Sequence, residues 1–270
     1  MVRRPLGNHH HGPDTLLVTS DTAQTEQTDA VATEPVATET EKLREVITRA
    51  RFVLFDFDGP MCRLFAGHSA EDVAKDLVEW LERQGLRGLL TEEERVHPDP
   101  HAVLRVVDRR HPRSDLVVEL EERLTQHELK AVASAMPTAW ADPLIRTWTA
   151  VGARLAVATN NSPLVVSRYL DSRGLAGCFT PNIYGRTRDL RHLKPHPYCL
   201  NRALTALGAA PSSALMIGDT PSDLYAAQRA GVPFLGYARN EDKATLLRRA
   251  GAEDVVGSLE PVLRVLRGQD

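Results

Sequence analysis

Two aspartates, Asp56 and Asp58, stand one residue apart where a short apolar run meets Gly59-Pro60. An apolar run that stops at Gly-Pro is typical of a strand buried on both faces of a parallel sheet. Alternate side chains of an extended chain point the same way, so we expect the two carboxylates to lie together. Adjacent carboxylates repel each other, and burying them without a cation is costly. The pattern therefore predicts a divalent metal ion at this strand end, with one carboxylate left free for chemistry.

Polar side chains also follow two later segments that are predicted to be strands. Thr159 and Asn160 follow Arg154–Ala158, and Asp219 follows Ala214–Ile217. In open parallel sheets, binding sites form outside the carboxyl ends of the strands. We therefore expect these strand ends to converge on one site together with the first pair of aspartates.

The elements around these strands predict an α/β fold. Strands alternate with helices over residues 42–63 and 144–262, which indicates a Rossmann-like three-layer core with a mostly parallel sheet. From 64 to 143, apolar residues recur at helical spacing, and we expect an inserted α-helical domain there. Residues 1–41 lack apolar periodicity and are predicted to be a disordered tail, in which His9–His11 are interpreted as incidental.

Capping residues, prolines and glycines set the expected bounds of the helices. In the insertion, Ser69 and Thr91 are expected to start helices, and others are expected over Ala102–Arg109 and from Ser114 to near Pro137. In the core we expect helices over Glu41–Arg51, Leu144–Val151, Pro163–Arg173, Pro197–Leu207, Pro221–Ala230 and Glu241–Ala250, and late strands over Pro233–Tyr237 and Asp254–Val256.

The composition excludes several classes of protein. The 270 residues, 42% hydrophobic and 26% charged, suffice for one good-sized core or two modest ones. A net charge of -3 gives no general attraction to nucleic acid or to anionic membranes, and no apolar stretch approaches the roughly 20 residues of a spanning helix. Three scattered cysteines without a C-x-x-C pair fit a reducing compartment, and the N-terminus lacks a secretory signal. We expect a cytoplasmic protein with neither a nucleic-acid nor a membrane partner.

Four motifs, in order along the chain, resemble the signatures of the haloacid dehalogenase superfamily. They are Asp56-Phe57-Asp58-Gly59, Thr159-Asn160 at its strand end, Lys194-Pro195-His196-Pro197, and Gly218-Asp219 followed by Asp223. The set covers the core from Phe52 to about Val256, and each motif stands on the element expected for it. The insertion falls where phosphatases of this superfamily carry a helical cap, and the arrangement is similar to that of phosphoglycolate phosphatases.

The resemblance implies a role for each acid. Asp56 would attack phosphorus to form an aspartyl-phosphate, while Asp58 would protonate the leaving oxygen and later deprotonate a water molecule. Mg²⁺ would be held by the Asp56 carboxylate, the Asp58 carbonyl and Asp219. Asp223 would lie behind these ligands or reach the metal through water.

The phosphoryl group would be bound by Thr159, Asn160 and Lys194, together with the backbone amides of Phe57 and Asp58. Pro60 stands where the family usually has Thr or Val, and it offers no N–H. We expect this difference to affect the fine geometry or the range of substrates rather than the chemistry.

Several cations could contact an anionic substrate, although most are interpreted as solvated charges: Arg63, His68, Arg105, Arg109 and Arg110. A basic loop also precedes Lys194 and contains Arg186, Arg188 and Arg191. This loop could steer an anion, but a basic loop without function is the favoured interpretation.

The function implied is a Mg²⁺-dependent phosphatase acting on a small phosphorylated metabolite. A phosphomutase of the same fold requires the same core residues and stays open. A dehalogenase is disfavoured, because Asp58 suits protonation of an alkoxide and not release of halide. A non-catalytic phosphate-sensing or binding module is a further alternative, although it has no need of so complete a charge set. The sequence determines neither the physiological substrate nor the oligomeric state.

Overall fold

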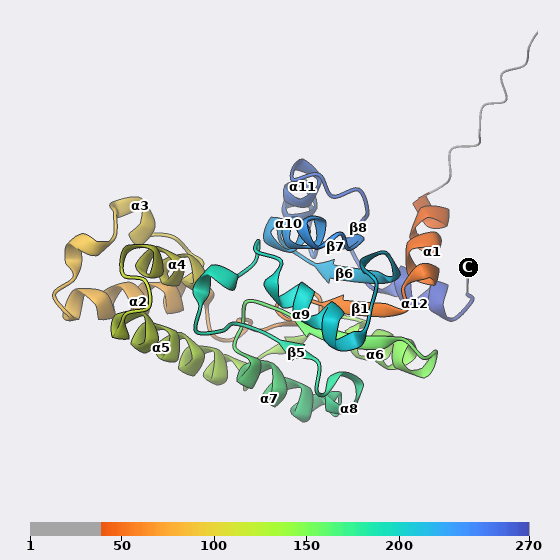
Figure 1. The fold of residues 1–270 in the computed structure, drawn as a ribbon, viewed down its shortest axis with the longest axis horizontal. Coiled ribbons are helices and arrows are strands. Elements are labelled where there is room, and N and C mark those ends of the chain that lie inside the picture. The colour runs from red at the N-terminus through yellow and green to blue at the C-terminus, as the bar shows by residue number, and fades with distance from the viewer. Residues whose placement is uncertain (1–38, 270) are drawn as a thin grey trace, which may run out of the picture. The chain divides into compact units, whose positions relative to one another are not determined.

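The computed structural model describes residues 39–269, so most of the predicted tail, with its three histidines, lies outside the described residues. The described chain forms a six-stranded sheet in the order β5-β4-β1-β6-β7-β8 and a separate pair, β2-β3 (Figure 1). All neighbours in the larger sheet run parallel. The predicted α/β fold with a Rossmann-like core is confirmed.

The strands are short, and the central three of the larger sheet, β4, β1 and β6, are largely buried. Their bounds are β1 Phe52–Phe55, β2 Cys62–Arg63, β3 Met136–Pro137, β4 Arg154–Ala158, β5 Ile183–Tyr184, β6 Ala214–Gly218, β7 Phe234–Tyr237 and β8 Val255–Val256. The α-helices are α1 Glu39–Arg49, α2 Ala70–Arg83, α3 Glu92–Arg95, α4 Pro100–Arg110, α5 Asp115–Val132, α6 Ala141–Ala150, α7 Pro163–Arg173, α8 Ala176–Phe179, α9 Tyr198–Leu207, α10 Pro221–Ala230, α11 Glu241–Arg249 and α12 Glu260–Leu266.

Helices cover the larger sheet on both faces. Side chains alternate along each strand, so the apolar strands present side chains that must be buried on both faces. Val53 and Phe55 of β1 belong to an apolar cluster with α6, α7 and α12. Leu54 points to the other face and packs in a cluster with α9 and α10. Central β1, paired with β4 and β6, is therefore buried on both sides, as its uninterrupted apolar sequence predicts.

The helices α2, α4 and α5 of the insertion share their own apolar cluster, which includes Leu77, Leu104 and Leu124. Ser69 caps α2 as predicted, and Thr91 forms the predicted capping box with Glu94. Apolar side chains at helical spacing thus build a second core, as the sequence indicates for an inserted helical domain.

Several expectations about element bounds are wrong; for example, α6 begins at Ala141 rather than at Leu144. Helix α5 ends at Val132 rather than near Pro137, because Met136 and Pro137 form β3, which pairs with β2. Helix α1 begins at Glu39, before the expected end of the tail. Strand β5 and helices α8 and α12 have no counterpart among the predicted elements; the first two are too short to carry a periodic signal.

Within residues 39–269, none of the helices has both the length and the apolar character required to cross a bilayer. The three cysteines of the chain are free thiols, and Cys62 and Cys199 are buried.

Candidate active site

Asp56 follows β1 directly and is held at the carboxyl edge of the sheet. Its N–H donates to Ile217 O of β6 at 2.9 Å, which continues the strand pairing by one residue. The residue is only 7% exposed. The first aspartate of the pair is therefore a buried acid on a rigid support.

Asp58 lies in the turn beyond the strand, and its Oδ1 accepts the Leu64 N–H at 2.8 Å. Gly59 has φ 119°, a backbone conformation that residues other than glycine rarely adopt. A Cβ at Gly59 would lie 2.3 Å from Asp219 Cγ. The glycine of the first motif is thus required for the ends of β1 and β6 to approach each other.

Lys194 lies between the carboxylates of Asp56 and Asp223 and is 1% exposed. Its Nζ lies 2.8 Å from Asp56 Oδ1 and 2.5 Å from Asp223 Oδ1, and it donates to Ala158 O at 3.0 Å. Burial alone would lower the pKa of Lys194, but Asp223 and Asp56 raise it above its ordinary value. The side chain therefore carries a positive charge at neutral pH.

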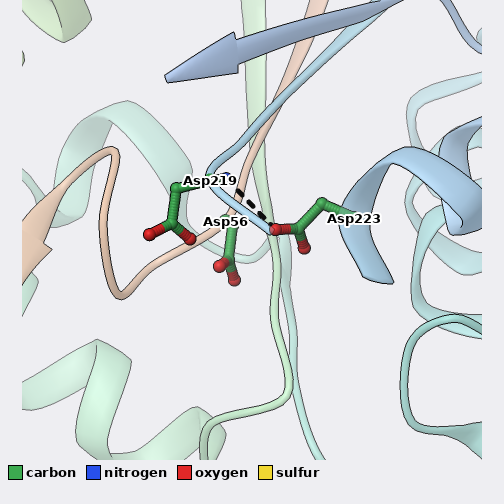
Figure 2. A group of neighbouring side chains, drawn as sticks. All are labelled: Asp56, Asp219 and Asp223. Carbon is green, nitrogen blue, oxygen red and sulfur yellow. Dashed lines mark hydrogen bonds between the residues drawn. The ribbon is translucent and has the colours of Figure 1, made fainter. Parts of the chain in front are cut away.

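Asp56, Asp219 and Asp223 form a buried acidic group at this edge, and Figure 2 shows their side chains together. Each offers a carboxylate oxygen, and these oxygens lie within 4.8 Å of one another. Among the described residues, the buried Oδ1 of Asp219 has no hydrogen-bond partner, and a bound cation would supply a partner. Mg²⁺ prefers such oxygen ligands, so the residues fit a site for this ion.

Asp223 is placed differently from the other two acids, because one of its oxygens accepts three hydrogen bonds and the other faces a lysine. Its Oδ2 accepts hydrogen bonds from the N–H of Asp219 at 3.2 Å and from the N–H and hydroxyl of Thr220 at 3.0 and 2.7 Å. Its Oδ1 faces Lys194. These contacts favour a role in holding the Asp219 loop and Lys194 over direct contact with a metal.

Asp219 has an additional cation beside it that the sequence did not suggest. Lys243, in the first turn of α11, forms an ion pair with Asp219 Oδ2. Burial raises the pKa of Asp219 to about 7, although Lys243 opposes the change. A metal ion beside this acid would stabilise its charged form.

The second motif supports the same edge of the sheet. Thr159 is 2% exposed, and its hydroxyl donates to Asn161 Oδ1 at 3.1 Å. The Asn160 side chain accepts the Lys194 N–H at 2.7 Å and donates to Lys194 O at 3.3 Å. It therefore fixes the backbone of Lys194, a contact that the sequence did not predict.

Phe57 contributes only its backbone to this edge. Its buried ring packs against Tyr169, with 5.3 Å between the ring centroids. The side chain therefore belongs to the core, as its position between the two aspartates requires.

Burial also changes the pKa values of the first pair. It raises the pKa of Asp58 to about 6, against the opposing hydrogen bond from Leu64. It raises the pKa of Asp56 too, where Lys194 opposes the effect and Asp223 adds to it. An acid with a pKa near neutrality can both give and take a proton, which suits Asp58 to general acid–base chemistry.

Two neighbouring cavities open onto these groups and share Asp58, Asp219 and Lys243. The first has a volume of about 480 Å³ and is lined by Asp56, Thr159, Lys194 and, from the insertion, His101 and Arg105. The second has a volume of about 520 Å³ and is lined by Arg63, Tyr237 and Arg239. The structure thus brings the predicted acids, Thr159 and Lys194 to one cavity that the insertion partly covers.

The basic loop before Lys194 has a role that neither interpretation from sequence foresaw. Arg186 is fully buried and forms an ion pair with Glu128 of α5, while Arg188 is exposed. Glu128 follows Leu120 and Leu124 at helical spacing, on the buried face of α5. In the sequence, the signal for this ion pair is the charged Glu128 on an otherwise apolar helix face, because a buried charge requires a partner.

A family model described as haloacid dehalogenase-like hydrolase matches residues 50–231. A phosphoglycolate phosphatase of Rhodospirillum rubrum is 38% identical over 113 residues, which cover 40% of this chain and 45% of that enzyme. A phosphoglycolate phosphatase of Aquifex aeolicus is 29% identical over 191 residues, which cover 67% of this chain and 81% of the enzyme. The chain thus spans about half the length of the first of these relatives.

Solved structures share the fold at low sequence identity. A predicted phosphatase from Clostridium acetobutylicum matches with a TM-score of 0.59 and 18% identity, covering 80% of this chain and 98% of that one. A predicted phosphoglycolate phosphatase from Haemophilus somnus matches with a TM-score of 0.57 and 18% identity, covering 81% and 97%. These matches show a shared fold.

Proposed function

The chain belongs to the haloacid dehalogenase-like hydrolases, and from this premise we propose that it is a Mg²⁺-dependent phosphatase acting through an aspartyl-phosphate on Asp56. The observation that carries the proposal is the convergence of Asp56, Asp58, Thr159 and Lys194 on one cavity. In phosphoryl transfer, the protein mainly positions the reacting groups and neutralises charge. A buried nucleophile, a neighbouring acid and a buried ammonium supply both.

The first half of the reaction uses Asp56 as nucleophile. One carboxylate oxygen of Asp56 attacks phosphorus, the bond from phosphorus to the ester oxygen breaks, and Asp58 gives its proton to the leaving oxygen. Lys194 and the Thr159 hydroxyl bind the phosphoryl oxygens. Mg²⁺ held by Asp56, the Asp58 carbonyl and Asp219 would offset the negative charge of the phosphoryl group.

The second half regenerates the enzyme. Asp58, now a carboxylate, takes a proton from water, whose oxygen attacks phosphorus as the bond to Asp56 breaks. Inorganic phosphate leaves, and the Asp56 carboxylate is restored. The pKa of Asp58, raised to about 6, suits both proton transfers. The helical insertion, proposed to span residues 64–143, would act as a cap that limits access of bulk water.

Phosphoglycolate is the first substrate to test. The relatives from Rhodospirillum rubrum and Aquifex aeolicus are phosphoglycolate phosphatases. The second cavity, which Arg63 and Arg239 line, supports an anionic leaving group. The Arg63 guanidinium donates to a neutral partner, Met136 Sδ, at 2.9 Å, and Arg239 lines the same cavity and is exposed. We propose that these two cations bind a carboxylate on the leaving group.

The test is phosphate release from a panel of small phosphate esters, with Mg²⁺ and with a chelator, by the wild type and by Asp56→Asn. Mg²⁺-dependent release that the substitution abolishes supports the proposal. Conversion of a sugar phosphate to its isomer without net release would instead identify a phosphomutase. Binding of phosphate without turnover of any ester would identify a binding module. The cytoplasmic location stays a prediction.

A further inference from the structure

Helix α5 of the insertion reaches into the loop that follows β4. Glu128, near the end of this helix, has no exposed side-chain surface. Its Oε1 accepts a hydrogen bond from Asn161 Nδ2 at 2.9 Å, and its Oε2 accepts one from the Ser162 N–H at 3.1 Å. One carboxylate of the insertion thus holds two consecutive residues of the loop that carries Thr159.

Arg186, from the loop after β5, completes this contact. Its Nη1 and Nη2 lie 2.9 and 3.0 Å from the two oxygens of Glu128, which is a bidentate ion pair with neither side chain exposed. Arg186 also donates to Asn160 O at 3.0 Å and to Thr125 Oγ1 of α5 at 2.8 Å. The guanidinium therefore joins α5 to the same loop from a second side.

A buried ion pair of this kind is poor evidence for a contribution to stability alone. Removing two charges from water is costly, and apolar residues of similar size often stabilise a protein as well or better. Charged groups do offer directional hydrogen bonds, and bidentate pairs between arginine and carboxylate are geometrically specific. The arrangement is therefore better explained by the position that it gives to the loop.

That position reaches the phosphate-binding hydroxyl through one residue. Asn161 donates to Glu128 through Nδ2 and accepts the Thr159 hydroxyl through Oδ1, at 3.1 Å. The Asn161 N–H also donates to Thr159 Oγ1, at 3.2 Å. The orientation of the Thr159 side chain is thus set by Asn161, and that of Asn161 by Glu128.

Glu128 also faces a residue of the catalytic cavity. His101, on α4, has its Nε2 3.5 Å from Glu128 Oε1 and 3.2 Å from Arg186 Nη1. His101 also lines the cavity that contains Asp56. In addition, Leu190 and Leu193, just before Lys194, are buried in the apolar cluster of the insertion. The insertion therefore contacts the supports of both phosphate-binding side chains, Thr159 and Lys194.

We propose that Glu128 and Arg186 form a positioning unit that orients Thr159 through Asn161, so that phosphate affinity depends on the docking of the helical insertion. Neither residue of the unit lines the cavity that contains Asp56. It acts on the binding site because the same carboxylate is shared by α5, Asn161 and Ser162. This inference rests on the proposed function of Thr159 as a phosphate ligand.

The test measures the affinity for inorganic phosphate by calorimetry in the presence of Mg²⁺, independently of turnover. Glu128→Gln is compared with Glu122→Gln, an exposed glutamate on the same helix, each in the wild-type background and in Thr159→Val. We expect Glu128→Gln to weaken phosphate binding roughly 10-fold in the wild type and less than about 2-fold in Thr159→Val, because the two residues act in series. Glu122→Gln should change neither value.

Asn161→Ala provides the second variant. It leaves the ion pair of Glu128 and Arg186 intact and removes the side chain that connects Glu128 to Thr159. It should weaken phosphate binding about as much as Glu128→Gln does, again only when Thr159 is present. Unchanged phosphate affinity in folded Glu128→Gln, or an equal loss in both backgrounds, would overturn the inference while leaving the phosphatase intact. A wild type that neither binds phosphate nor hydrolyses any ester would overturn the proposed function as well.

Discussion

Lys194 Nζ lies 2.8 Å from Asp56 Oδ1, although 138 residues separate the two along the chain. The contact follows from the strand order, because β1 and β4 are neighbours and Lys194 also donates to Ala158 O at the end of β4. A buried ammonium at this distance favours the ionised form of Asp56, which is the nucleophilic form. It also leaves positive charge where a phosphoryl group would be transferred.

Asp56→Asn should abolish hydrolysis, lowering kcat by a factor on the order of 10⁴ or more, because the amide cannot form the acyl-phosphate. The measurement is phosphate release under saturating Mg²⁺. Asp171→Asn, at an exposed position on α7, is the matched control and should retain wild-type activity. Substantial turnover by Asp56→Asn would show that another group attacks phosphorus.

Asp58→Asn should slow hydrolysis of alkyl phosphates by about 10²–10⁴-fold, because the leaving alkoxide then lacks its proton donor. The loss should be much smaller for the first step with p-nitrophenyl phosphate, since a leaving group of low pKa departs without protonation. Burst kinetics with both esters would separate this step from hydrolysis of the intermediate. Equal loss of the first step for both esters would argue that Asp58 only supports the fold of the loop.

Removal of divalent metal should abolish activity, and Mg²⁺ should restore it. Mg²⁺ should also raise the Tm of the wild type, because the cation relieves repulsion among buried carboxylates that include Asp56 and Asp219. Asp219→Asn should weaken Mg²⁺ binding by at least about 10-fold, as measured by calorimetry. Activity that survives exhaustive chelation would contradict the proposed metal site.

The pH dependence of stability should report on His101. Burial alone would lower its pKa, but Asp99 and Glu128 raise it from 6.5 to about 9. The stabilisation is therefore fully present below pH 6.5 and is lost as the pH rises through about 9. Relative to His101→Gln, the wild type should lose on the order of 2–3 kcal/mol of unfolding free energy across this range. A difference between the two proteins that stays constant with pH would contradict this account.

Glu128 should act at the other end of the pH scale. Its pKa is lowered from 4.5 to about 2; burial opposes this shift, while Arg186 and His101 produce it. The stabilisation from this carboxylate is thus present above pH 4.5 and is lost as the pH falls through about 2. Urea unfolding of wild type and Glu128→Gln at pH 5 and pH 3 should show the wild-type advantage shrinking in acid. An advantage that is unchanged at pH 3 would show that the ion pair does not control this pKa.

Arg63→Gln should separate anionic from neutral leaving groups. If Arg63 binds a carboxylate, the variant should raise KM for phosphoglycolate about 10-fold, the expected value of one charge-assisted hydrogen bond, and leave KM for ethyl phosphate unchanged. Arg109→Gln, an exposed arginine on α4, is the control and should affect neither ester. An equal effect of Arg63→Gln on both esters would remove the argument for an anionic leaving group.

The sequence alone was sufficient to predict that the strand-end residues of this site lie at one edge of the sheet. Asp56, Thr159 and Asp219 each end a strand whose apolar residues identify it, and parallel strands present their carboxyl ends on one edge. Capping residues such as Ser69 and Thr91 likewise signal the start of their helices locally. Patterns of this kind are readable because the interactions that they encode span only a few residues, or follow from the general geometry of a parallel sheet.

Only the tertiary structure decided which charges lie together. Glu128 and Arg186 are 58 residues apart, and Lys243 meets Asp219 from a helix outside the four motifs. A charge on a buried helix face signals that a partner must exist, because an unpaired buried charge is too costly. It does not say which partner, since any of the cations on neighbouring loops could serve. That choice depends on how α5 packs against the core, and packing is a property of the whole fold.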